Sequence, residues 1–231
     1  MALQSSGARP RLRGVSHHIA FYVALAAGAV LIAGANDRRT MAVTALYVGC
    51  LVSMFGASAL LHRSDWGPRA FGWLRRIDHA MIFACIAGTY TPFCLLGLDS
   101  PAGTRLLILV WCAAGLGILR ALLWPHAPRA VSSVLYVVVG WVMLVYFPEV
   151  HAALAPVVFA LLVIGGAVFT IGALVYLVRR PDPWPTVFGY HEVFHVLIVI
   201  GCVCHFAAIE RVALARRAST SMGEPGKLLG R

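Results

Sequence analysis

Charged residues are scarce in this sequence, and their scarcity decides the class of protein. Only 12% of the 231 residues are Asp, Glu, Lys or Arg, whereas a soluble domain carries about 25%. Hydrophobic residues make up 60% of the chain, and the mean hydropathy is +0.83. This composition excludes an ordinary soluble globular domain and predicts an all-α, polytopic integral membrane protein.

The sequence also lacks any Cys-x-x-Cys pair. Its cysteines all fall in or at the ends of apolar runs: Cys50, Cys85, Cys94, Cys112, Cys202 and Cys204. This placement argues against a zinc knuckle and against a disulfide framework. We expect these cysteines to act as small side chains buried within the membrane.

Seven apolar runs are long enough to cross a bilayer, which takes about 20 residues in a helix. Their connections are short, so we expect one seven-transmembrane-helix bundle at residues 16–209 and no second domain. The predicted spans are 16–35, 41–62, 76–97, 104–124, 130–148, 153–178 and 187–209.

The two ends of the chain are polar. Residues 1–15 form a basic segment with no small-residue cleavage site behind it, so we interpret the first span as a retained helix. Residues 210–231 lack an apolar pattern, and we expect them to be a disordered tail.

Arginines gather at the connections on one side of the predicted bundle, and this bias orients it. With the N-terminus inside, the inner segments hold Arg9, Arg11, Arg13, Arg63, Arg69, Arg75, Arg76, Arg120, Arg129, Arg179 and Arg180. The outer connections hold only Arg38, Arg39 and Arg105, although five further basic residues lie after residue 209. We therefore expect a multi-pass protein of the cell membrane (the inner or plasma membrane), with its N-terminus in the cytoplasm and its C-terminus outside. The same bias explains the net charge of +10 without nucleic-acid binding.

The most informative motif is His191-Glu192-Val193-Phe194-His195 at the start of the seventh span. Histidines four residues apart lie on one face of a helix, so both imidazoles can bind one metal ion. The soluble counterpart is the zinc-binding His-Glu-x-x-His helix. Imidazoles inside a membrane span are costly unless they are paired or coordinated, so the motif predicts an intramembrane site.

Alternating spans bring three polar segments to the same side of the membrane. The second span ends on Ser58-Ala59-Leu60-Leu61-His62, the third begins near Asp78, and the seventh begins at the histidine pair. We predict that His62, His191 and His195 bind Zn²⁺ near the cytoplasmic face, leaving a fourth position open for water, as in catalytic zinc sites. We expect Asp78 to hold that water or a ligand histidine, and Ser58 to hydrogen-bond either Asp78 or a developing oxyanion.

The remaining polar residues of the spans have less specific interpretations. Glu192 is either a base, as in soluble zinc helices, or a partner for an inner arginine or the interface. His79 is expected to face a neighbouring helix or the lipid head groups. His205 lies about 15 Å beyond His195, too far to share its metal ion, so we expect its hydrogen bonds to be made within the bundle. Pro92 is expected to kink the third helix. We interpret the other histidines as interfacial groups: His17, His18, His126 and His151.

At these residues the chain resembles the hemolysin III branch of the progestin and adipoQ receptor superfamily. The matching pieces lie between about residues 14 and 209: Ser58–His62, Asp78–Phe83, Ala87–Phe93, His191–His195 and His205-Phe206. The resemblance implies seven helices, a cytoplasmic N-terminus, and zinc bound by His62, His191 and His195. Ser58 and Asp78 match residues that line the site in the receptors and in the related alkaline ceramidases. Many members carry an acid near the start of the first helix, and Gly14–His18 contains none.

Three functions remain open from the sequence. The first is a zinc-dependent hydrolase of ceramide-like lipid amides, with Asp78 and Ser58 as catalytic residues. The second is a membrane-active lysin, since pore formation is reported for some bacterial members, or a receptor-like module in which zinc is structural. A transporter is the weakest, because the acidic residues of the spans, Asp78 and Glu192, both lie at one end. Membrane lipids are the expected partners, and nothing indicates a protein partner.

Overall fold

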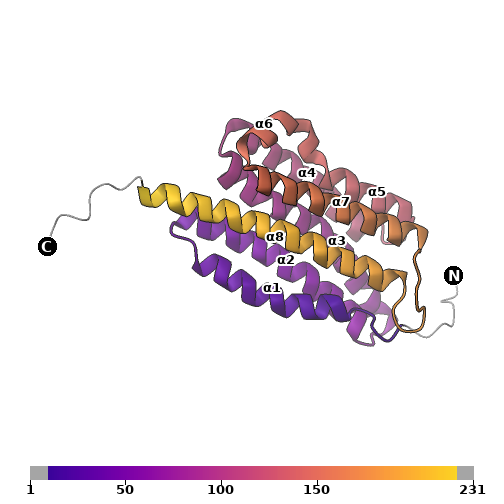
Figure 1. Ribbon diagram of the computed structural model, residues 1–231. Helices are drawn as coiled ribbons and strands as arrows, with labels where there is room; N and C mark the ends of the chain where they lie inside the picture. The colour runs from indigo at the N-terminus through magenta and orange to yellow at the C-terminus, as the bar shows by residue number, and fades with distance from the viewer. Residues whose placement is uncertain (1–9, 223–231) are drawn as a thin grey trace.

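The computed structural model describes residues 10–222, with side chains up to residue 218, and it is helical throughout (Figure 1). Among the described residues, seven helical segments are long and apolar enough to cross a membrane, which confirms the seven-helix bundle. The elements are α1 (Val15–Ala33), α2 (Arg38–Arg63), α3 (Pro68–Pro92), η1 (Phe93–Leu98), α4 (Pro101–Leu123), α5 (Arg129–Gly140), η2 (Val142–Tyr146), α6 (Phe147–Ala153), α7 (Pro156–Val178) and α8 (Tyr190–Met222).

Short polar and proline-containing connections define where several helices begin. The Asp37 carboxylate caps α2 by accepting a hydrogen bond from the Thr40 amide at 2.9 Å. Ser100 caps α4 in the same way, accepting from the Gly103 amide at 3.2 Å. Pro68, Pro101 and Pro156 each occupy the first helical position, where a missing amide hydrogen costs nothing.

The spans alternate in direction, so each end of the bundle gathers a fixed set of helix termini. We call one end the histidine end. It holds the beginnings of α1, α3, α5 and α8 and the ends of α2, α4 and α7. In Figure 1 it is the side where α1 begins and where the loop between α7 and α8 lies. Helix α3 packs against α2, α4, α5 and α8, and this central position lets it form a wall of the site.

Two boundaries differ from the sequence prediction. Helix α3 begins at Pro68, about two turns before the predicted start at residue 76. Helix α8 continues to Met222, so the prediction of a disordered tail from residue 210 is wrong for residues 210–222. Val212 and Ala213 are buried, and Arg216 forms an ion pair with Asp99, which explains why the helix persists. The rest of the tail and residues 1–9 of the basic N-terminal segment lie outside the described residues.

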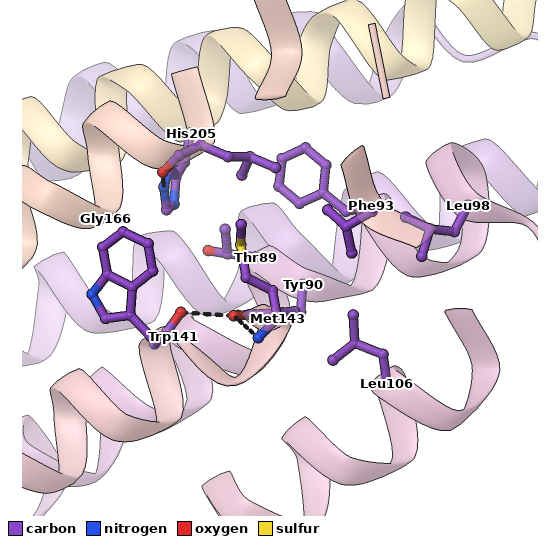
Figure 2. A pocket seen from close by; sticks show the side chains of 12 residues that line it. Thr89, Tyr90, Phe93, Leu98, Leu106, Trp141, Met143, Gly166 and His205 are labelled. Atoms are coloured by element: carbon purple, nitrogen blue, oxygen red, sulfur yellow. Dashed lines mark hydrogen bonds between the residues drawn. The ribbon is translucent and has the colours of Figure 1, made fainter. Parts of the chain in front are cut away.

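The fifth span is interrupted, where the sequence predicted one helix over residues 130–148. Helix α5 ends at Gly140, and a short 3₁₀ segment leads into α6, which reaches Ala153. The Tyr90 hydroxyl donates to the Gly140 carbonyl at 2.6 Å and accepts from the Met143 amide at 3.1 Å, so it satisfies backbone groups freed by the break (Figure 2). In α3, the disruption expected at Pro92 takes the form of the π-helix η1, which follows it directly.

Candidate metal centre

Three histidines meet at the histidine end of the bundle, where α2 ends and α8 begins. The Nε2 atoms of His62 and His191 are 3.3 Å apart. One ligand nitrogen from each of His62, His191 and His195 lies within 4.8 Å of the others. Two nitrogens bound to one tetrahedral metal ion at about 2.0–2.1 Å are separated by about 3.3 Å, so the spacing of His62 and His191 fits a shared ion. The predicted convergence of these three histidines is therefore confirmed, and the cluster could hold a metal ion.

The first turn of α8 is fixed by two carboxylates, which sets the direction of the histidine pair. Asp182 accepts a hydrogen bond from the Tyr190 amide at 2.8 Å, and Glu192 Oε2 accepts one from the Gly189 amide at 2.8 Å. These bonds satisfy amide groups that a helix start leaves without partners. The histidine pair therefore starts in a helical turn whose backbone amides are held by these two carboxylates.

Glu192 is engaged away from the cluster. Its Oε1 atom forms an ion pair with Arg13 Nε at 2.8 Å, and its side chain is only 2% exposed. Of the two interpretations of Glu192, pairing with an arginine of the N-terminal segment agrees with this geometry. The carboxylate therefore joins the chain before α1 to the start of α8, and both of its oxygens have partners.

His17 belongs to the site, although the sequence analysis treated it as an interfacial group. Its side chain is 4% exposed, and its Nδ1 lies 2.8 Å from the Ser58 hydroxyl. Its ring stacks on that of His195, with centroids 3.8 Å apart and planes 6° from parallel. The interfacial interpretation of His17 is wrong because the first turn of α1 faces the bundle. The alternation of the spans could have placed His17 at this end of the bundle, since α1 and α8 start there, but not on the face of α1 that packs inward.

Ser58 lies between His17 and Asp78. The Ser58 side chain is 3% exposed, sits one turn before His62 on α2, and shares a hydrogen bond with His17 Nδ1. It is close enough to the Asp78 carboxylate on α3 to act on it, and both residues line the same cavity. Side chains from α1, α2 and α3 therefore gather beside the histidine cluster. The structure places Ser58 beside Asp78, and its contact with a developing oxyanion stays a prediction.

Two ring nitrogens of the site have no partner. Nε2 of His17 and Nδ1 of His195 are both buried and make no hydrogen bond in the described part of the chain. Buried polar atoms in native proteins nearly always have a partner. The unmatched nitrogens therefore indicate that the site accommodates a further group, such as an ion or a water molecule.

Comparisons with known proteins agree with this arrangement. Residues 6–206 match the family described as Haemolysin-III related. The chain belongs to this family. It is 29% identical over 198 residues to Hemolysin-3 of Bacillus cereus, covering 84% of this chain and 87% of the relative. It is 30% identical over 159 residues to a Hemolysin-3 homolog of Bacillus subtilis (strain 168), covering 69% and 71% of the two chains. The resemblance inferred from the sequence is thus confirmed.

The family extends to a plant protein. The chain is 29% identical over 153 residues to the heptahelical transmembrane protein ADIPOR2 of Oryza sativa subsp. japonica, covering 58% of this chain and 66% of the relative. That description, seven helices across a membrane, agrees with the seven apolar helical segments found here. The Haemolysin-III match includes all the site residues described above: His17, Ser58, His62, Asp78, His191 and His195.

A cavity of about 140 Å³ opens from the site into the bundle between α3, α5, α7 and α8. About 10–15 Å³ holds one water molecule, so this space can take several waters or part of a lipid chain. Its histidine end is polar, with Ser58, Asp78 and His191, and its middle is lined mainly by apolar side chains such as Ile82 and Phe169. The cavity therefore resembles a binding site for a molecule with one polar end.

The far end of this cavity lies near Tyr90, Trp141 and His205, and a smaller pocket adjoins it there (Figure 2). His205 Nε2 lies 3.2 Å from the Leu162 carbonyl, so this histidine is satisfied within the bundle, as predicted. His205 is ten residues from His195, which places the far end about 15 Å from the histidine cluster.

The other histidines lie away from the metal cluster. His79 lines the cavity on α3, consistent with the prediction that it faces a neighbouring helix. His18 packs edge-on against Tyr22, and His151 stacks on Phe147. His18, His126 and His151 are all exposed, so the interfacial interpretation agrees with the structure for these three, and it fails for His17.

Proposed function

We propose that this member of the Haemolysin-III related family is a zinc-dependent hydrolase of lipid amides of the ceramide class. The observation that carries the proposal is the position of the three-histidine cluster. It lies at the polar end of an otherwise apolar cavity, beside Ser58 and Asp78. A membrane lipid with an acyl chain and a polar amide region has the same distribution of polarity.

Zinc is the metal that suits this set of ligands. Three imidazole nitrogens with one open position are the ligand set of catalytic zinc sites, and neutral imidazole is a preferred zinc ligand. When bound, zinc would polarise the amide carbonyl and make a water molecule acidic enough to supply hydroxide near pH 7.

Asp78 and Ser58 are the residues proposed to assist hydrolysis. The Asp78 carboxylate borders the cavity and would accept a proton from the attacking water and return it to the departing amine. The C–N bond breaks, a C–O bond forms, and the products are a fatty acid and an amine. Ser58, held between His17 and Asp78, would keep the carboxylate turned toward the cavity.

The substrate would enter with its amide at the cluster and its acyl chain along the cavity. The walls beyond the cluster include Ile82, Ile86, Phe169 and Ile198, which offer no charge to an acyl chain. The distance of about 15 Å between the cluster and His205 leaves length for part of an acyl chain along the cavity.

We further propose that the histidine end faces the cytoplasm and that the protein resides in the cell membrane. Arginine is concentrated in the segments at that end, as the positive-inside rule requires. A single cysteine introduced by Ser5→Cys into a cysteine-free variant should resist a membrane-impermeant thiol reagent in intact cells and react after lysis. Labelling in intact cells would contradict this orientation.

The hydrolase proposal is tested with purified, zinc-loaded protein, ceramide and simple N-acyl lipids, with and without a chelator. We expect release of fatty acid that stops when the chelator removes the metal and recovers when zinc is returned. The matched control is His18→Ala, an exposed histidine outside the cluster, which should retain turnover. Absence of turnover on every amide, with zinc bound, would overturn the proposal.

Membrane lysis is the second candidate, because two of the relatives carry the name Hemolysin-3 or are called a homolog of it. A dye-leakage assay with liposomes separates the two candidates. Leakage that is unchanged in His62→Ala and His191→Ala would place a lytic function outside the histidine cluster. Turnover of lipid amides without leakage would support the hydrolase.

A further inference from the structure

Three arginines at the histidine end lie next to residues that line the cavity, and no part of the hydrolase proposal uses them. They come from three helices: Arg75 on α3, Arg120 in the last turn of α4, and Arg129 at the start of α5. Each is partly buried, unlike the exposed Arg69 and Arg180 at the same end. Exposed arginines are enough to orient a membrane protein by the positive-inside rule. That rule therefore does not explain why these three arginines are partly buried.

Each of these arginines is tied to the wall of the cavity. Arg75 lies one helical turn from His79, and Arg129 lies one turn from Ser133; both His79 and Ser133 line the cavity. Arg120 donates a hydrogen bond to the Ser132 hydroxyl at 2.8 Å. The guanidinium of Arg129 lies over the ring of Tyr176, 5.4 Å from its centroid, and Tyr176 is another lining residue.

None of the three forms an ion pair with a carboxylate in the described part of the chain. There, Arg13 pairs with Glu192, and Arg39 and Arg216 pair with Asp99. Nε of Arg120 and Nη1 of Arg129 are buried without a hydrogen-bond partner, and so is the Ser133 hydroxyl in the cavity wall.

One acid, Asp78, lies close to this group, since Arg75 precedes it by three residues and acts on it electrostatically. Even with Asp78 ionised, three guanidinium groups and one carboxylate give this region a net positive charge. A partly desolvated guanidinium with free donors is the usual partner of phosphate and carboxylate groups. Basic pockets between membrane helices on the cytoplasmic side bind anionic lipid head groups for this reason.

We propose that Arg75, Arg120 and Arg129 form an anion subsite that binds the phosphate group of an amide lipid whose acyl chain occupies the cavity. The amide in this ligand rests on the proposed function, whereas the anion subsite follows from the arginines alone. The subsite makes the protein selective for amide lipids that carry a phosphate over neutral ones. Its ligand is a lipid head group and not free phosphate, because the cavity below the arginines is apolar.

The test measures equilibrium binding of two radiolabelled lipids to the full chain in phosphatidylcholine nanodiscs. The two lipids are a ceramide and the same ceramide with a phosphate on its primary hydroxyl. We expect the phosphorylated lipid to bind about tenfold more tightly or better, since one Arg–phosphate contact commonly contributes about 1.4 kcal/mol or more. Mass spectrometry of the bound fraction verifies that the lipid is intact.

The variant Arg75→Gln/Arg120→Gln/Arg129→Gln should lose this preference and keep the affinity for neutral ceramide. Arg129→Gln alone should lose part of the preference for the phosphorylated lipid. This single variant tests the proposal if the triple variant does not fold. Arg69→Gln, an exposed arginine on the same helix as Arg75, is the matched control and should retain the preference. A preference that is absent in the wild type, or unchanged in both arginine variants, would overturn the proposal.

A competition with inorganic phosphate separates the two sources of the anion. Millimolar phosphate should leave the bound lipid in place if the head group is held together with its chain. Displacement of the lipid by millimolar phosphate would show a free-phosphate site and overturn the lipid assignment. The binding test is independent of turnover. A preference for the phosphorylated lipid that depends on the arginines, without amide hydrolysis, would overturn only the hydrolase proposal. Amide hydrolysis without this preference would overturn only the anion subsite.

Discussion

The imidazole of His17 lies nearly parallel to that of His195, with ring centroids 3.8 Å apart. The contact joins α1 to α8, and the same His17 ring is hydrogen-bonded to Ser58 on α2. One side chain therefore restricts the orientation of a candidate ligand and of the serine beside it. Partners of this kind around metal ligands commonly contribute a factor of about 10–100 in metal affinity.

His17→Ala should lower the affinity for zinc by about tenfold to a hundredfold, because both the stacking and the bond to Ser58 are lost. His17→Phe keeps a stacked ring but removes the hydrogen bond, so its affinity should lie between those of the wild type and the alanine variant. Chelator competition measures the affinity, and the absorption spectrum of the cobalt-substituted protein reports the geometry of the ligands. His18→Ala is the control, since His18 is exposed. Equal affinity in His17→Ala and the wild type would refute a positioning role.

Asp78→Asn should retain zinc and lose turnover. Proton transfer by a positioned side chain contributes about 10²–10⁴ to a rate, so kcat should fall by that factor with little change in KM. Ser58→Ala should have a smaller effect, because Asp78 remains present but less firmly oriented. Steady-state kinetics with parallel metal analysis measures both effects. Full activity in Asp78→Asn would remove Asp78 from the proposed mechanism.

Glu192→Gln should destabilise the protein without acting on the chemistry. The variant breaks the buried ion pair with Arg13 and leaves a partly buried guanidinium, at a cost of about 1–3 kcal/mol. A double-mutant cycle with Arg13→Gln, read by unfolding in detergent, should give a favourable coupling energy between the two side chains. Activity per bound zinc should stay near that of the wild type. A loss of activity per zinc comparable to that of Asp78→Asn would restore Glu192 as a candidate base.

The other end of the bundle should respond to acid through Asp99. Arg39 and Arg216 hydrogen-bond this carboxylate at 2.7 Å and 2.8 Å and hold its pKa below the ordinary value of 3.8. A lowered pKa in the folded state stabilises the protein above the unfolded-state pKa, and this contribution disappears as the pH falls through the folded-state value. Asp99→Asn should therefore be less stable than the wild type at pH 7 by no more than about 1 kcal/mol, because solvent screens an exposed pair.

The difference in stability between Asp99→Asn and the wild type should disappear as the pH falls below the ordinary pKa of aspartate. Thermal unfolding in detergent at several pH values measures it, with the exposed Glu210→Gln as the control. A difference between Asp99→Asn and the wild type that persists at the lowest pH would assign the effect to packing instead of charge.

The three-histidine cluster could be predicted because two independent regularities agree on it. The spacing of His191 and His195 fixes their common helix face, and the alternation of spans brings His62 to the same end. His17 could not be found by spacing, since His17 has no polar neighbour one turn further along its own helix. Its role depends on which face of α1 packs inward, and only the packed bundle defines that face.

The helical extension at residues 210–222 was missed for a different reason. Its arginines interrupt the apolar pattern, so hydropathy alone marks it as a tail. Yet Val212 and Ala213 pack inward, and Arg216 forms an ion pair with Asp99, which follows η1. The pairing of a distant acid with this segment is a tertiary contact, and no local pattern in the sequence predicts it.

The most direct test of the account is the zinc content of the purified protein. Metal analysis should find about one zinc per chain in the wild type and in the control variant His18→Ala, because three imidazoles with one open position form a high-affinity zinc site. His191→Ala should retain far less zinc after dialysis, since two imidazoles remain. A wild-type protein that holds no zinc after purification and exposure to zinc would contradict the central claim, and so would full occupancy in His191→Ala.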